Sequence, residues 1–128
     1  MKPGAGLYWV VTLIAGITIV SGLAQMVAPG MILRFISGET TPTSLHFFGI
    51  IGMFMALFGG ALMHALLSVS RQPIVVLWAG LQKFGAVAAV GLGVLKSIFS
   101  PLALLVAGFD LLSALLVICY WLGIRESS

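Results

Sequence analysis

Long apolar stretches dominate the chain, and short polar segments separate them. The apolar stretches cover residues 7–28, 45–69, 73–95 and 101–124. An α-helix needs roughly 20 apolar residues to cross the hydrocarbon layer of a membrane. The pattern therefore predicts four transmembrane helices.

The separators fit helices that turn back on one another. Pro73 and Pro101 follow short polar turns, at places where a helix can begin. Connections this short force neighbouring helices to run antiparallel. A membrane β-barrel would need strands of about 10 residues with alternating polarity, which these stretches lack. We expect an all-α fold, an integral membrane antiparallel four-helix bundle, as one domain over residues 1–128.

The connection over residues 30–44 is the longest. Met31–Ile36 fits a short amphipathic segment lying in the membrane interface, and the polar residues after it lead back to the second span. Ser44 is a candidate N-terminal cap for that span. This connection is either a solvated linker or a contact site for a soluble partner.

Composition narrows the class of protein. Of the 128 residues, 61% are hydrophobic and 7% are charged. In soluble domains about a quarter of the residues are charged, so a soluble enzyme is excluded, and so is a disordered chain. The 6 Lys and Arg residues are too scattered for a nucleic-acid-binding face. The single cysteine, Cys119, excludes an intrachain disulfide.

The cations indicate an orientation. Lys2, Arg71 and Arg125 share one predicted side, against Arg34 and Lys96 on the other. Positive residues favour the cytoplasmic side, so we expect both termini in the cytoplasm. The length of the first apolar stretch favours a retained helix over a cleaved signal peptide.

Small residues recur at helical spacing within the spans. Membrane helices associate through such residues because their backbones can approach closely. The pattern predicts packing ridges, either within the chain or against other subunits, at Gly52, Ala56 and Gly60 in the second span and at Gly85, Ala89 and Gly93 in the third.

Two ionisable residues lie deep within the predicted spans. Lys83 is in the middle of the third span and Asp110 in the fourth, each roughly 14–15 Å from its entry surface at about 1.5 Å per residue. An isolated charge there costs at least about 3 kcal/mol. We therefore predict a buried ion pair, direct or bridged by water, which either fixes the helix arrangement or serves transport. Gln82 points toward the ridge of the third span and is a candidate contact for another helix or a head group.

No set of residues indicates catalysis, so we expect a protein that is not an enzyme. The two histidines, His46 and His64, are about 27 Å apart along one helix and cannot share a metal or haem. Either histidine could be the single axial ligand of a haem or chlorophyll, and His64 is the better candidate because Gly60 lies one turn before it and leaves room for a flat ring. We predict no bound metal and no firm cofactor; lipid, quinone or chlorophyll-type pigment stay open.

The layout of four spans, the mid-span Lys83 and the segment Gly108-Phe109-Asp110-Leu111 resemble the DoxX-like group of small bacterial membrane proteins. The likeness covers Lys83 to Leu115, and it departs from the group at Gln82, where glycine often precedes the lysine. The resemblance implies a bacterial inner-membrane protein, sometimes a small companion of a redox enzyme.

These features favour a non-catalytic accessory subunit of a larger bacterial membrane complex, with membrane subunits and lipids as partners. Redox and photosynthetic complexes are the candidate classes. Two alternatives stay open. One is a small proton-coupled carrier using Lys83 and Asp110, and the other is a subunit that binds quinone, lipid or pigment.

Overall fold

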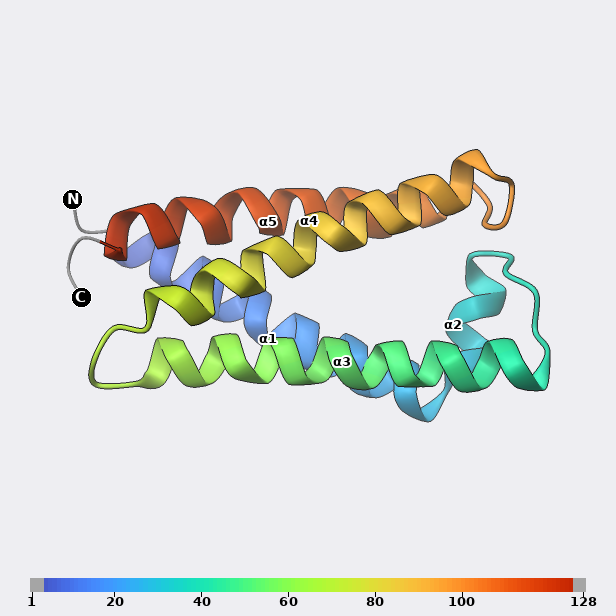
Figure 1. Ribbon diagram of the computed structural model, residues 1–128, viewed down its shortest axis with the longest axis horizontal. Coiled ribbons are helices and arrows are strands. Elements are labelled where there is room, and N and C mark those ends of the chain that lie inside the picture. The colour runs from blue at the N-terminus through green and yellow to red at the C-terminus, as the bar shows by residue number, and fades with distance from the viewer. Residues whose placement is uncertain (1–3, 126–128) are drawn as a thin grey trace.

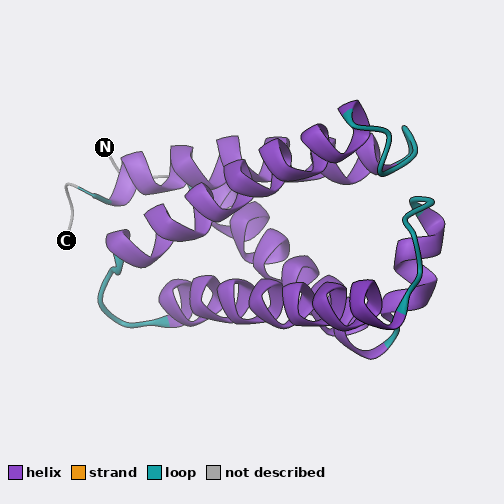
Figure 2. Ribbon diagram, turned by 45° about the vertical axis from the view of Figure 1, so that its right-hand side comes forward, coloured by secondary structure: helices purple, strands orange, loops and turns teal. Residues whose placement is uncertain are grey.

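The computed structural model describes residues 4–125, and these residues form helices joined by short loops, without strands. The prediction of an all-α chain is confirmed. Four of the helices are long and apolar enough to cross a membrane. The helices are α1 (Ala5–Val27), α2 (Pro29–Phe35), α3 (Pro42–Leu67), α4 (Pro73–Leu95) and α5 (Ala103–Ile124) (Figures 1 and 2).

The helix boundaries correct several expectations. Most of the segment predicted as Met31–Ile36 belongs to α2, which ends at Phe35 with Ile36 as its C-cap. The helix begins earlier than that segment because Pro29 is suited to a first helical position. Ser44 is not the cap of α3. Thr41 is the cap, and the Thr41 and Ser44 side chains each accept a hydrogen bond from the other's backbone N–H, at 3.1 and 2.9 Å. Pro101 lies in a turn, so α5 begins two residues later than predicted.

The long helices form two closely packed pairs. α1 packs mainly on α3, and α4 packs mainly on α5. In Figure 1, α4 runs away from the end where α1 begins, and α5 returns to it. The connection over residues 68–72 lies at that same end, which we call the terminal end. α2 and the connection over residues 96–102 lie at the opposite end.

The core consists of two apolar clusters, one toward each end. The terminal-end cluster joins four helices through residues such as Val11, Leu62, Val76 and Val117. The cluster at the opposite end joins Leu33 and Ile36 to Ala103, with Phe48, Val90 and Phe99 against them. A backbone hydrogen bond of 2.8 Å from Ser100 N to Ile36 O holds the two loops together there.

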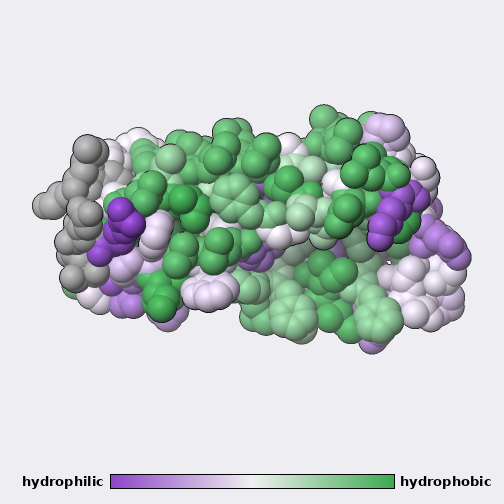
Figure 3. Space-filling view, turned by 45° about the horizontal axis from the view of Figure 1, so that its top comes forward, coloured by the Kyte–Doolittle hydropathy of each residue, from purple (hydrophilic) through white to green (hydrophobic). Residues whose placement is uncertain are grey.

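The outer surface is apolar along the middle of the molecule. In the face drawn in Figure 3, hydrophobic side chains cover the central part and hydrophilic ones gather mostly toward the ends. Large side chains such as Leu13 at 63% and Leu105 at 68% remain exposed. Water would penalise such a surface, whereas lipid would not.

Candidate functional site

A polar cluster lies between the two apolar cores. Lys83 Nζ is 3.6 Å from Asp110 Oδ1, and the two residues are only 3% and 8% exposed. Lys83 Nζ also donates a 2.5 Å hydrogen bond to Thr18 Oγ1. The cluster therefore links α4 and α5, which form one helix pair, to α1 of the other pair.

Small neighbours make room for the cluster. On α5, Asp110 shares a buried face with Ala107, Ser113 and Ala114, and on α4 Ala79 and Gly80 are buried one turn before Lys83. The ammonium group also lies 5.6 Å from the centre of the Phe109 ring. A lysine that meets a carboxylate, a hydroxyl and an aromatic ring has its charge balanced locally, as a buried cation requires.

Thr18 is the member of this cluster that the sequence analysis missed. Its hydroxyl donates to Ile14 O at 2.8 Å and accepts from Lys83. A threonine bonded to its own helix looks self-sufficient in sequence, because membrane helices tolerate such residues. The signal that could have found it was its depth, since Thr18 lies far inside the first apolar stretch.

The small-residue ridge of α3 packs against α1. A Cβ added at Gly22 of α1 would lie 2.5 Å from Ala56 N and 2.6 Å from Gly52 O. A Cβ on Gly59 would lie 3.0 Å from Ile19 N. Gly60 does not pack within the described chain, because a Cβ there would meet nothing within 4 Å; the buried ridge continues through Gly59 instead.

The ridge of α4 is different. A Cβ on Gly85 would meet nothing within 4 Å, and Ala89 is exposed, so neither residue packs within the described part of the chain. Gly93 does pack, but against the Phe99 ring of the following loop rather than against another helix, and a Cβ added there would lie 2.5 Å from that ring. Gly85 and Ala89 stay open because α5 packs on the side of α4 that carries Lys83.

Gln82 lies beside this open ridge. It is half-buried, and its side chain forms no hydrogen bond with any of residues 4–125. By contrast Gln25, buried in the last turn of α1, donates a 3.0 Å hydrogen bond to Phe48 O. Gln82 is thus a polar group in the middle of an apolar helix that its own described chain leaves unpaired.

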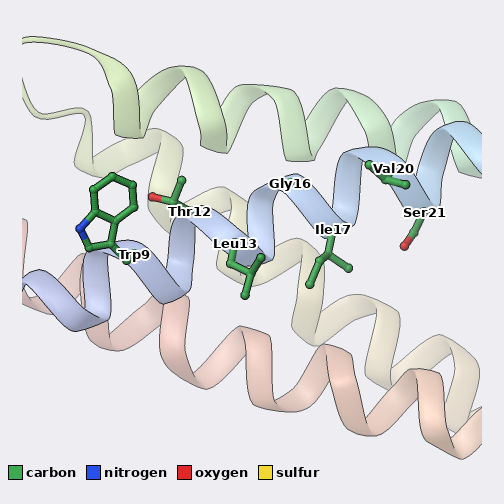
Figure 4. A pocket seen from close by; sticks show the side chains of 7 residues that line it. All are labelled: Trp9, Thr12, Leu13, Gly16, Ile17, Val20 and Ser21. Carbon is green, nitrogen blue, oxygen red and sulfur yellow. The ribbon is translucent and has the colours of Figure 1, made fainter.

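The structure brings no ligand set around the histidines. His46 and His64 are both exposed on α3, and no group of three His, Cys, Asp or Glu residues within residues 4–125 is placed to hold a metal. A shallow groove runs along α1, but Figure 4 shows that its lining comes from that helix alone, from Trp9 to Ser21. His64 does not line it, so the pigment-ligand hypothesis gains no second group.

The cations of the orientation hypothesis divide between the ends of the molecule. Arg71 and Arg125 lie toward the terminal end, whereas Arg34 and Lys96 lie toward the opposite end (Figure 1). Lys2 is outside the described residues.

Comparisons of this chain with models of protein families, with curated proteins and with solved structures each found no match.

Proposed function

We propose that this chain crosses a bacterial inner membrane as an antiparallel four-helix bundle, with both termini in the cytoplasm. We further propose that it is a non-catalytic accessory subunit of a larger membrane complex. The bacterial setting rests on the DoxX-like resemblance. The accessory role rests on the outer face of α4.

The observation that carries this proposal is the pairing of Gln82 with an open small-residue ridge. Gly85 and Ala89 follow Gln82 by three and seven residues, so the three share one helical face. A helix of another subunit can approach closely over the small residues and hydrogen-bond the carboxamide. Facing lipid instead, the carboxamide would have no partner, which is unfavourable.

The buried cluster supports the same role. Lys83 has its partners within the chain, and the cluster holds helices of both pairs together. In this proposal Lys83, Asp110 and Thr18 make a fixed scaffold, and α4 presents its opposite side to the partner.

Site-specific photocrosslinking tests the proposal. A photoreactive residue at Ala89 should give cross-links to a larger membrane protein, whereas one at Leu105, an exposed residue of α5, should give lipid adducts alone. Gly85→Leu should abolish copurification in mild detergent without lowering the melting temperature of the purified chain. Recovery of the wild type as a lone chain, or equal cross-linking from both positions, would contradict an α4 interface.

A proton-coupled carrier is the second candidate, and one observation favours it. Among residues 4–125, the Asp110 carboxylate pairs with Lys83 and with no other polar side chain. The Asp110 side chain also keeps 11% of its surface exposed. A carboxylate with unused oxygen lone pairs can take up a proton. Flux in proteoliposomes that Asp110→Asn abolishes, with the helix content of the reconstituted variant retained, would favour the carrier over the accessory subunit.

A further inference from the structure

A second polar feature lies at the terminal end, away from the Lys83 cluster. A cavity of about 230 Å³ opens between the ends of α1, α3, α4 and α5 and the connection over residues 68–72. Its polar lining comes from Tyr8, Ser68, Arg71, Gln72 and Tyr120. Apolar residues such as Val76 and Ile124 form its floor. The cavity is therefore a polar recess set into the end of an apolar helix bundle.

The Tyr120 side chain is buried, but its hydroxyl has no hydrogen-bond partner in the described part of the chain. The residue is 7% exposed. In that part of the chain Ser100 Oγ is the one fully enclosed side-chain polar atom without a partner, so the Tyr120 hydroxyl is not enclosed and opens on the cavity it lines. The neighbouring Tyr8 hydroxyl, in contrast, donates a 2.9 Å hydrogen bond to Leu66 O. The Tyr120 hydroxyl can therefore donate a hydrogen bond to a molecule bound in the cavity.

The cavity also carries positive charge beside the Tyr120 hydroxyl. Arg71 is half-buried beside the cavity, forms no ion pair or hydrogen bond with residues 4–125, and acts electrostatically on the Tyr120 phenol. The cavity also adjoins the first turn of α4, where Gln72 is the N-cap but its side chain makes no capping bond. The uncapped N–H groups of a helix start carry partial positive charge and favour anions.

We propose that this cavity binds a phosphate oxyanion, supplied by the headgroup of an anionic lipid. The Arg71 guanidinium pairs with the phosphate oxygens, and the Tyr120 hydroxyl donates to one of them. The lipid is the expected source because the recess lies where the apolar surfaces of four helices end, at the level of headgroups if the helices cross a membrane. The inference requires that membrane position but not the accessory role, so either can fail alone.

The experiment uses the full chain in a phosphate-free maltoside detergent. Phosphatidylglycerol, diacylglycerol and inorganic phosphate are titrated separately, and bound molecules are counted by native mass spectrometry. We expect phosphatidylglycerol to bind at one saturable site, with affinity lowered about tenfold or more by Arg71→Gln and less by Tyr120→Phe, as loss of a charge-assisted and of a neutral hydrogen bond predicts. Tyr120→Phe keeps the ring that packs beside Tyr8, 6.2 Å between centroids, so the fold should be retained.

Lys96→Gln is the matched control, because it removes one cation at the opposite end. Diacylglycerol lacks the phosphate and should not bind at this site. Saturable binding of inorganic phosphate that depends on Arg71 would establish the same site with free phosphate as its source. Equal effects of Arg71→Gln and Lys96→Gln, or diacylglycerol binding as well as phosphatidylglycerol, would overturn the proposal.

Discussion

The small residues of α3 and of α4 have similar spacing and opposite surroundings. Gly52 and Ala56 of α3 lie against the backbone of α1, so close that a Cβ on Gly22 would collide with backbone atoms. On α4, a Cβ on Gly85 would meet nothing within 4 Å, and Ala89 is exposed. Small-residue spacing therefore indicates that a helix can be approached closely, but it does not say whether the approaching helix belongs to the same chain.

The largest expected effect breaks the inner contact. Gly22→Leu places a branched side chain where backbone atoms would lie 2.5 Å from its Cβ, and backbone cannot move aside without separating α1 from α3. We expect a loss of more than about 3 kcal/mol in the free energy of unfolding, measured by denaturation in mild detergent. Gly85→Leu on the purified chain should not lower it, because a Cβ on Gly85 meets nothing within 4 Å and leucine is a better helix former than glycine. Similar losses in both variants would mean that α4 is covered within the chain.

Much of the fold was predictable because its cause is a one-dimensional pattern. Long apolar stretches predict helices regardless of how they pack, and the turns around Arg71 and Lys96 are marked by polar residues and proline. The exact starts of the helices could not be predicted from the sequence, because the choice between Thr41 and Ser44 as the N-cap depends on side-chain geometry. Ser44 was recognised as a capping residue, but it occupies the third helical position, where it bonds back to Thr41.

The part of the candidate site that could be predicted is the part in which two residues at the same depth of neighbouring helices have to lie close together. Lys83 and Asp110 have similar depths on consecutive helices, and the structure places their charged groups 3.6 Å apart. Thr18 is on a helix far away in sequence, and depth alone does not say which of the other helices faces Lys83. The cavity beside Arg71 and Tyr120 depends on four helix ends meeting, which no local pattern encodes.

The second largest expected effect is a difference in stability between substitutions on the two sides of α4. Lys83→Met leaves the Asp110 carboxylate buried without its partner, and we expect a loss of about 3 kcal/mol in the free energy of unfolding. Gln82→Met, one residue away on the outer side, should cost less than about 0.5 kcal/mol in the purified chain, because Gln82 has no partner among residues 4–125 to lose. Denaturation in one detergent checks both variants.

A double variant then distinguishes the attraction between Lys83 and Asp110 from the cost of burying either charge alone. Lys83→Met combined with Asp110→Leu removes both charges, so its stability should return to within about 1 kcal/mol of wild type. A double variant as unstable as the sum of the single losses would mean that the two residues act independently, which the 3.6 Å separation contradicts.

The smallest expected effect sharpens the comparison to two adjacent residues of α3. A Cβ on Gly60 meets nothing within 4 Å, so Gly60→Ala should raise the free energy of unfolding by about 0.5 kcal/mol through helix propensity alone. A Cβ on Gly59 would lie 3.0 Å from Ile19 N and 3.1 Å from Thr18 Cγ2, so Gly59→Ala has to push α1 away. It should lose about 1 kcal/mol. Because the two alanines have the same intrinsic propensity, opposite signs in parallel denaturation curves would isolate helix contact as the cause, and equal signs would refute the assignment of Gly59 to the buried ridge.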